Sequence, residues 1–337
     1  MRDVIELAVQ LMEVESTSGS EGAVIALVER LLTEGSWRVT RIPVSPGRED
    51  IFATKRDGPF VTLSTHLDTV PPHIPPRMDG DRLWGRGACD AKGIAAAMIS
   101  AAERLDERGL PVALLFVVGE EVSHDGAHAA NEWAARSGVV SRILIDGEPT
   151  ESTLALGTKG AMRATLRVHG VAAHSAYPNL GRSATRELAR ILAALDDLEL
   201  PRDDVLGDTT INIGVISGGV ADNVVAPSAE ARLMARTVGP PEEVLHRLRD
   251  LVGDRGDLHQ GITAPAVRLG VLPGYPTSVV AYATDIPALS NWGKPYLFGP
   301  GSIHVAHRDD EHIAIEELRT AVDTYERLAA EALELVR

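Results

Sequence analysis

Apolar residues recur along this chain with two different spacings. Residues 4–12 and 24–32 each place their apolar side chains on one helical face, which predicts two amphipathic helices. Short, almost continuous apolar runs follow at residues 60–63, 112–118 and 143–145. Such runs are typical of strands that are buried on both faces of a sheet.

Helical stretches at residues 93–99 and 127–133 separate these runs. Strands that alternate with helices predict an α/β fold with a mostly parallel, helix-covered sheet. The same character returns from about residue 269, with an apolar run at 295–298 and a closing helix over roughly 314–335. We therefore assign residues 1–157 and 269–337 to one catalytic domain.

The pattern changes near residue 158. Residues 161–168 alternate apolar and polar side chains, as a half-exposed strand does, and residues 211–216 and 229–237 are similar. Helical patterns cover residues 183–195 and 242–252. Residues 158–268 are therefore predicted to form a smaller α+β domain inserted into the first.

Composition narrows the possible partners. The formal net charge of −15 over 337 residues argues against a nucleic-acid or anionic-membrane partner, because both require a basic face. No run approaches the length of a membrane-spanning helix, and the acidic N-terminus does not have the pattern of a signal peptide. Cys89 is the single cysteine, so an internal disulfide is excluded. We expect a cytoplasmic protein.

Imidazole and carboxylate groups follow the predicted strands and turns in a fixed order: His66, Asp90, Glu120-Glu121, Glu148 and His307. In α/β sheets, ligands gather where the carboxyl ends of strands meet, so these side chains are expected to converge. Two imidazoles and three carboxylates suit a pair of divalent cations, zinc first among them. One carboxylate, Glu120, remains free to move protons. The sequence predicts a two-metal hydrolase.

Several of these residues have alternative interpretations. Asp68 either orients the His66 imidazole or stabilises the loop that follows it. Glu120 and Glu121 point to opposite faces if they continue a strand, which would leave one to bind metal and one to face substrate. A single carboxylate at a strand end is usually a cap or a solvated loop residue, and Asp90 also fits the N-cap of the next helix. The ordered combination favours the metal site.

Longer motifs surround the same residues. They are Ser64-Thr65-His66-Leu67-Asp68-Thr69-Val70-Pro71, Gly85-Arg86-Gly87 through Asp90-Ala91-Lys92-Gly93, Glu120-Glu121, Gly147-Glu148-Pro149-Thr150, and Gly299-Pro300-Gly301 with His307-Arg308-Asp309-Asp310-Glu311. Over its whole length the chain resembles the M20 metallopeptidase and amidohydrolase family. That family holds acetylornithine deacetylase, succinyl-diaminopimelate desuccinylase, aminoacylase, carboxypeptidases and dipeptidases.

The resemblance implies a role for each candidate. Asp90 would bridge two Zn²⁺ ions, for which Co²⁺ or Mn²⁺ are possible substitutes. His66 and Glu148 would complete one site, and Glu121 and His307 the other. Glu120 would be the general base and later the proton donor to the leaving amine. The resemblance also implies a cis peptide bond between Asp90 and Ala91.

Three positions near these ligands leave alternatives open. His304 competes with His307 as the C-terminal ligand, although the spacing to Asp310 and Glu311 selects His307. Asp146 competes with Glu148. Cys89, next to Asp90, is interpreted as a small buried packing residue.

The inserted domain resembles the lid of this family, which also serves for dimerisation. His174 would stabilise the oxyanion, reaching across a homodimer into the partner's site. Asn223 would contact substrate, and Gly299 and Gly301 are further substrate-binding candidates in the catalytic domain. Arg236 would hold the substrate α-carboxylate, or it is an ordinary arginine on a strand surface.

The leading functional prediction is a dizinc amidohydrolase that cleaves an N-acyl amino acid, most similar to the acetylornithine deacetylase of arginine biosynthesis. The alternative within the family is an exopeptidase or dipeptidase. A third possibility is a hydrolase that releases an amino acid from an acidic carrier protein, for which basic residues of the insert would form a rim: Arg163, Arg167, Arg182 and Arg186.

Overall fold

The computed structural model describes residues 3–335, which divide into two compact units. The first unit contains the chain up to Leu156, Leu269–Ser278 and the chain from Thr284 onward. The second contains Gly157–Arg268 and Val279–Ala283. The boundaries expected from the sequence lie beside these, except that the second unit also includes the short segment at 279–283.

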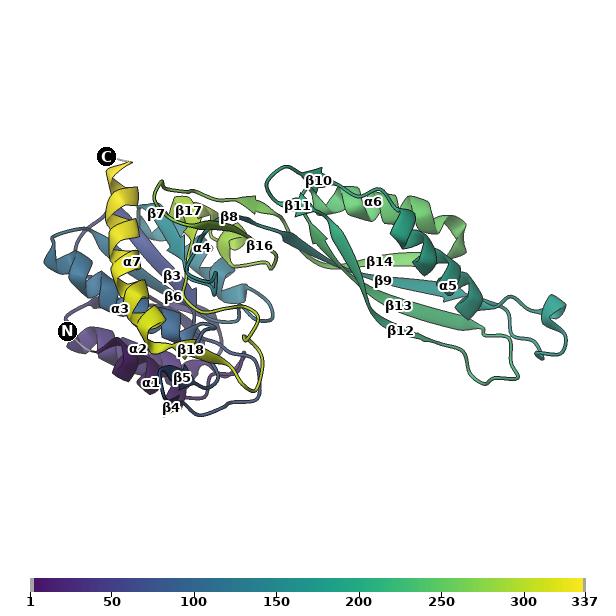
Figure 1. The fold of residues 1–337 in the computed structure, drawn as a ribbon, viewed down its shortest axis with the longest axis horizontal. Coiled ribbons are helices and arrows are strands. Elements are labelled where there is room, and N and C mark those ends of the chain that lie inside the picture. The colour runs from purple at the N-terminus through teal and green to yellow at the C-terminus, as the bar shows by residue number, and fades with distance from the viewer. Residues whose placement is uncertain (1–2, 336–337) are drawn as a thin grey trace. The chain divides into compact units, whose positions relative to one another are not determined.

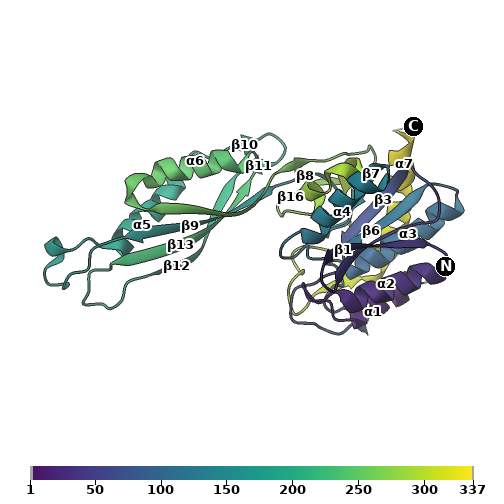
Figure 2. The same ribbon diagram turned by 180° about the vertical axis from the view of Figure 1, so that it is seen from behind.

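A six-stranded sheet forms the centre of the first unit (Figures 1 and 2). Its order is β1 (Arg38–Ser45), β2 (Arg48–Thr54), β6 (Val112–Val117), β3 (Phe60–His66), β7 (Ser141–Asp146) and β17 (Lys294–Leu297). The four strands from β6 to β17 run parallel, whereas β1 and β2 form an antiparallel hairpin at one edge. The predicted mostly parallel sheet is confirmed.

Helices cover both faces of this sheet. One face packs against α1 (Val4–Glu13), α2 (Gly22–Glu34), α3 (Lys92–Glu107) and α7 (Ile315–Glu334). The other face packs against α4 (Asp125–Ser137), where the Phe52 ring lies 5.0 Å from that of Trp133 and 5.8 Å from that of Trp292. Neighbouring residues of a strand point to opposite faces, so the central strands β3 and β6 need apolar or well-packed side chains along their whole length.

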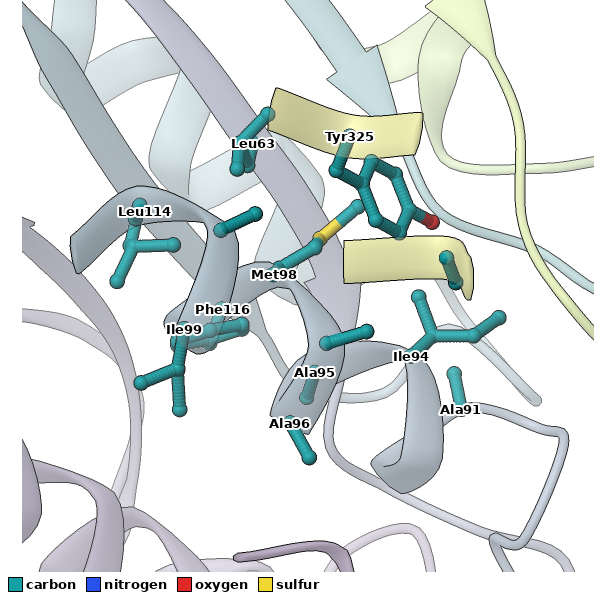
Figure 3. Packing of buried hydrophobic residues seen from close by; sticks show 14 of the residues in the cluster. Leu63, Ala91, Ile94, Ala95, Ala96, Met98, Ile99, Leu114, Phe116 and Tyr325 are labelled. Carbon is teal, nitrogen blue, oxygen red and sulfur yellow. The ribbon is translucent and has the colours of Figure 1, made fainter. Parts of the chain in front are cut away.

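The core beneath α3 explains why that helix begins beside the candidate site. Ile94, Met98 and Ile99 pack with Leu63, Leu114 and Phe116 of the sheet and with Tyr325 of α7 (Figure 3). The Tyr325 hydroxyl donates to the Phe298 carbonyl at 2.7 Å, which ties α7 to the end of β17. These contacts fix the start of α3 close to the carboxyl ends of the parallel strands.

Shorter strands and 3-10 turns occur in both units. One small sheet has the order β18 (His312–Ala314), β5 (Arg82–Trp84) and β4 (Arg77–Asp79). Another has the order β15 (Val267–Arg268), β8 (Leu154–Thr158) and β16 (Thr277–Val280). The 3-10 turns are η1 (Pro178–Leu180), η2 (Ala194–Asp197), η3 (Gly253–Arg255), η4 (Ile286–Ala288) and η5 (Ser290–Trp292).

The second unit is an antiparallel sheet with two helices on one face. The sheet has the order β12 (Thr210–Gly218), β13 (Ser228–Thr237), β9 (Gly160–His169) and β14 (Asp257–Ala264). The helices are α5 (Ala184–Ala193) and α6 (Pro241–Val252), and a small hairpin pairs β10 (Arg202–Asp203) with β11 (Gly207–Asp208). In β9 and β13 buried and more exposed residues alternate, as the sequence predicts for a half-exposed sheet. Among residues 3–335, no helix has the length and apolar character needed to cross a bilayer.

Candidate metal centre and active site

His66 and Asp68 lie at the carboxyl end of the central strand β3. His66 is the last residue of β3 and is 1% exposed. Its Nδ1 lies 2.9 Å from the Asp68 backbone carbonyl oxygen and 3.6 Å from the Asp68 carboxylate, so the carbonyl is the closer partner. A carbonyl can only accept, so Nδ1 carries the proton and Nε2 is left as the ligand atom.

Asp90 lies between two imidazoles. Its Oδ1 is 3.0 Å from Nε2 of His66, and its Oδ2 is 3.1 Å from Nε2 of His307. The His307 Nε2 also lies 2.9 Å from an oxygen of Glu121. Each oxygen of one carboxylate therefore faces a different nitrogen ligand, which is the arrangement that a bridging carboxylate requires. The Asp90–Ala91 peptide bond is cis, as predicted.

Glu148, not Asp146, completes the group around His66. Its Oε1 lies 3.9 Å from Nε2 of His66, and ligand atoms of His66, Glu120 and Glu148 lie within 4.8 Å of one another. A second such group contains His66, Asp90 and Glu121. Asp146 ends β7 as a buried residue and is a member of neither group.

His307 rather than His304 approaches the cluster. The His304 side chain is 82% exposed and its Nε2 lies 3.7 Å from Glu151. His307 has a positive φ of 65°, a backbone conformation that is uncommon outside glycine and turns its ring toward Asp90 and Glu121. The geometry supports His307 as the ligand, and the assignment remains a prediction.

Glu120 and Glu121 lie in a turn, not in a strand. The strand β6 ends at Val117, so the predicted alternation of two strand neighbours does not apply. The amides of Val122, Ser123 and His124 instead donate to the carbonyl of Gly119. Gly119 has a φ of 77°, and a Cβ there would lie 2.2 Å from Asp125, so only glycine fits at the start of this turn.

Asp68 holds this turn through its carboxylate. Its Oδ1 accepts the amide of Glu120 at 3.1 Å, and its Oδ2 accepts the amide of Glu121 at 3.3 Å. The Ser18 hydroxyl donates to the same Oδ2 at 2.7 Å. The backbone carbonyl of Asp68, rather than its carboxylate, is thus the closer partner of the imidazole, and the carboxylate holds the turn with the two glutamates rather than the loop that follows Asp68.

A buried ion pair holds the loop that carries Asp90. Arg86 and Glu311 are both buried, and their side chains lie 2.8 Å apart. The second Glu311 oxygen accepts the amides of Cys89 and Asp90, each at 3.2 Å. Cys89 is fully buried in the core, which agrees with its interpretation as a packing residue.

The electrostatics of the cluster call for added positive charge. Burial raises the pKa of Glu120 and of Glu148 well above the ordinary value. The hydrogen bonds that the His307 imidazole donates to the Asp90 and Glu121 carboxylates raise its pKa to about 10. Burial opposes protonation of His66, but the carboxylates of Asp68, Asp90 and Glu148 outweigh it and raise its pKa as well. In their protonated form, the His66 and His307 imidazoles would therefore place positive charge beside the cluster carboxylates.

The donor set fits a pair of divalent cations. It offers imidazole nitrogens and carboxylate oxygens, with one carboxylate able to bridge, and this combination suits zinc, cobalt or manganese. Two such cations would compensate the excess of buried carboxylates, which would otherwise repel one another. His66, Asp90 and Glu148 would hold one cation, and Asp90, Glu121 and His307 the other.

Two residues of the cluster were not singled out from the sequence. His124 Nδ1 lies 2.8 Å from the Oδ1 of Asp285 and 3.9 Å from Glu120. Ligand atoms of Glu120, His124 and Asp285 lie within 4.8 Å of one another. His124 carries a faint signal, because it lies four residues after Glu120, but Asp285 is 161 residues further along the chain and has none.

The remaining candidates of the insert belong to the second unit. His174 pairs with Val224 in an isolated bridge, and the Ser175 amide donates to the Asn223 carbonyl at 2.9 Å, so His174 and Asn223 lie in adjoining loops. Arg236 lies near the end of β13 that is remote from these loops. Within the second unit the three residues therefore do not form one cluster.

Gly299 and Gly301 lie beside Glu148 in the first unit. A Cβ at Gly299 would lie 2.3 Å from the Glu148 carbonyl oxygen, so this glycine permits close packing against the ligand loop. The amide of Gly299 donates to Thr150 and that of Gly301 to Glu317. Both amides are thus engaged within the protein, and a contact of either glycine with substrate remains a prediction.

Comparisons with known proteins agree with this geometry. The family described as "Peptidase dimerisation domain" matches residues 156–258. A protein of Paracoccidioides lutzii named a probable carboxypeptidase is 38% identical over 371 residues, which cover 96% of this chain and 84% of that protein.

Solved structures share the fold. A tripeptidase from Staphylococcus aureus has a TM-score of 0.83 at 18% identity and covers 97% of each chain. A protein of Bacillus subtilis described as a dinuclear metal binding peptidase from the M20 family has a TM-score of 0.75 at 16% identity and covers 98% of each chain. At these identities the likeness concerns the fold alone.

Proposed function

Because the chain belongs to the M20 family of metallopeptidases, we propose that it is a dinuclear exopeptidase that releases an amino acid from the C-terminal end of short peptides. The coarser statement, that it hydrolyses amide bonds with the help of metal, follows from family membership. The choice of peptide end and the residue roles are our proposal.

One observation carries the catalytic part of the proposal. The Asp90 carboxylate lies between the nitrogens of His66 and His307, and the Glu120 carboxylate lies close to the same group without being needed as the bridge. Two cations bound here would lower the pKa of an attacking water and stabilise the negative charge that develops on the scissile carbonyl. We assign zinc as the default metal on donor chemistry.

Glu120 is the proton carrier in this scheme. Its side chain is 11% exposed, and burial raises its pKa, so this carboxylate holds a proton more readily than an exposed glutamate does. The carboxylate accepts a proton from the attacking water as the new C–O bond forms. It then donates that proton to the amine nitrogen as the C–N bond breaks. The carboxylic acid product then ionises and its proton passes to the amine, so the products are a carboxylate and an ammonium group.

Two residues of the insert would complete the site. Nδ1 of His174 accepts the Ala176 amide at 3.1 Å, so the neutral ring carries its proton on Nε2 and presents it as a donor. That donor suits a developing oxyanion. Arg236 is half buried, and among residues 3–335 no acidic side chain lies within ion-pair distance of its guanidinium. Its guanidinium is thus available for a substrate carboxylate.

The preference for peptides over N-acetylornithine rests on the relatives. The Paracoccidioides protein that matches nearly the whole chain is named a probable carboxypeptidase, and the Staphylococcus structure is that of a tripeptidase. The narrower expectation of an acetylornithine deacetylase has no comparable support. An unpaired arginine also fits the free carboxylate that every carboxypeptidase substrate carries.

The test is amine release by protein stripped of metal and reloaded with zinc or cobalt. The substrates are a dipeptide blocked at its N-terminus, the same dipeptide amidated at its C-terminus, an unblocked tripeptide and Nα-acetylornithine. Cleavage of the blocked dipeptide but not of its amide supports the proposal. Cleavage that requires a free amine would make the protein an aminopeptidase, and turnover of acetylornithine alone would make it a deacylase.

A further inference from the structure

We propose that His124 and Asp285 form a positioning pair that holds the catalytic turn Gly119–His124, and with it the Glu120 carboxylate, in its working conformation. This inference rests on the proposed role of Glu120 and adds two residues to it. Neither residue is needed as a ligand in the scheme above. They would act through the turn rather than on the substrate.

The backbone of the turn is held by two sets of hydrogen bonds. The Asp68 carboxylate accepts the amides of Glu120 and Glu121, and the Gly119 carbonyl accepts three amides from residues 122–124. These bonds fix the backbone but leave the far end of the turn, where α4 begins at Asp125, without a side-chain cap of its own. His124, the N-cap position of α4, makes no capping hydrogen bond to the helix.

His124 instead directs its ring away from the helix toward Asp285. Its backbone is in the left-handed region, with a φ of 55°, which is uncommon for a residue other than glycine and costs energy there. The ring Nδ1 donates to the Asp285 Oδ1 at 2.8 Å. The same nitrogen lies 3.9 Å from the Glu120 Oε1, which is too long for a hydrogen bond but places the ring beside the general base.

Asp285 is arranged to serve this contact. Its side chain is 3% exposed, although it begins the short turn η4 in a loop. Aspartate at such a position usually caps its own helix, yet this side chain makes no capping bond. A buried carboxylate is costly unless it is hydrogen-bonded, and the His124 imidazole supplies that bond. The hydrogen bond thus satisfies the buried Asp285 carboxylate, and it helps to hold His124 in its left-handed backbone conformation.

The pair would affect kcat by fixing the position of the Glu120 carboxylate. A catalytic carboxylate must lie within a few tenths of an ångström of its productive place, and a shift of about 1 Å can cost about 100-fold in rate. The pair ties the end of the turn to a separate part of the unit, 161 residues away along the chain. Loss of the tie would loosen the end of the turn and remove the ring that lies beside the Glu120 carboxylate, while the bonds to Asp68 and the rest of the fold stay intact.

Two substitutions at His124 separate the effect of its hydrogen bond to Asp285 from the effect of its left-handed backbone conformation. His124→Gly keeps the left-handed backbone at no steric cost but removes the ring. His124→Asn also tolerates that backbone, and its amide can still donate to Asp285. For the zinc-loaded enzyme we expect His124→Gly to lower kcat by about 10- to 100-fold with KM within about 3-fold. His124→Asn should recover most of that loss.

The second measurement does not depend on activity. Amide hydrogen exchange of the segment 119–124 should become faster in His124→Gly and stay slow in His124→Asn. Asp285→Ala should reproduce the His124→Gly result, and the double variant should be no worse than either single one, because both remove the same interaction. His128→Asn, at an exposed histidine one turn along α4, is the matched control and should leave both readouts unchanged.

The outcomes distinguish this inference from the proposed function. If His124→Gly and His124→Asn have the same kcat as each other and the same amide exchange rates in segment 119–124, the positioning role is overturned even if the enzyme is an active peptidase. Additive losses in the double variant would do the same. If no peptide is turned over by the wild-type protein, the proposed function fails, and the exchange data alone then decide whether the tether exists.

Discussion

Within the candidate site, one side chain decides how many cations the cluster is built to hold. Asp90 turns one oxygen toward His66 and the other toward His307, while Glu148 and Glu121 each lie beside one of these imidazoles. A cluster built for a single ion would gather its ligands around one point. Because the two oxygens of Asp90 face different imidazoles, the arrangement indicates two neighbouring ion positions.

The two adjacent glutamates should have separate roles. Glu120→Gln should keep two equivalents of zinc and lower kcat by about 100- to 10,000-fold, since the proton acceptor is lost and the ligands remain. Glu121→Gln, the matched neighbour, should instead release one equivalent. Metal content by elemental analysis and turnover of the blocked dipeptide check both variants. Near-normal turnover by Glu120→Gln would remove it as the base.

Asp146 offers a prediction on pH and stability. Burial raises its pKa to about 8, whereas the same group in the unfolded chain titrates near 4. Between these values the folded state holds a proton that the unfolded state has released, so the wild-type protein loses stability as pH rises through this window, by up to about 1.4 kcal/mol per pH unit.

Asp146→Asn carries no such proton. Its free energy of unfolding, relative to that of the wild-type protein, should therefore rise from about pH 5 to about pH 8 and level off above. Urea titrations of the metal-free proteins at several pH values check this. A difference that does not change with pH would show that Asp146 is ionised throughout. Zinc content should stay at two equivalents, unlike that of Glu148→Gln.

Single residues also mark the limit of sequence reasoning. The side chains that the structure brings together around Asp90 could be predicted because each lies in a short motif, as His66 does in Ser64–Asp68. His124 and Asp285 could not, because their partnership joins positions 161 residues apart and neither stands in a chemical motif. Contacts of that kind arise only when the chain is folded.

Among the elements, those with strong periodicity were predicted and those with little burial were not. The strands β3, β6 and β7 are buried along nearly their whole length and appear as apolar runs. The edge strand β1 buries only Ile42 and contains Pro43, so no pattern marks it. The sequence left open whether Glu120 and Glu121 continue a strand, because the long-range bond from the Glu120 amide to Asp68 that helps to hold the turn forms only in the folded chain.

The loop before α3 should depend on its buried ion pair. Glu311→Ala leaves the Arg86 guanidinium buried without its carboxylate and frees the amides of Cys89 and Asp90. Removing one partner of a buried pair costs about 3–5 kcal/mol, so the free energy of unfolding should fall by that order. Zinc affinity should fall too, because the Asp90 backbone is no longer held.

The control for this change is the residue next to Glu311. Asp310 pairs with Arg308 at 2.8 Å, but both side chains are more than half exposed. Exposed pairs contribute little, so Asp310→Ala should change the free energy of unfolding by less than about 1 kcal/mol. Chemical denaturation of both variants checks the comparison. Similar small losses in the two would show that the Arg86–Glu311 pair does not hold the loop.

For the whole molecule, the second unit raises the question of self-association. Its strand β12 has a neighbour on one side only within the described residues, and it exposes Ile213, Val215 and Ile216. An exposed apolar edge strand is a site for pairing with another chain. The opposite edge strand β14 exposes one large apolar residue, Ile262. The β12 edge is therefore the better candidate for the homodimer interface.

A pair of matched substitutions tests this interface. Ile216 and Ile262 are each 62% exposed, and they lie on the two opposite edge strands of the same sheet. A lysine on an edge strand disfavours strand pairing. Ile216→Lys should convert a dimer to a monomer in sedimentation, whereas Ile262→Lys should leave the dimer intact. If the β14 variant dissociates instead, the interface lies at that edge.

The same variant shows whether His174 acts across the dimer. The ligands and Glu120 belong to the first unit, so a monomeric Ile216→Lys protein should retain two equivalents of zinc. If the partner's His174 supplies the oxyanion donor, kcat should fall by about 100-fold or more on dissociation, and His174→Ala should lower it no further in the monomer. A fully active monomer would place the oxyanion donor within a single chain and would remove dimerisation from the mechanism.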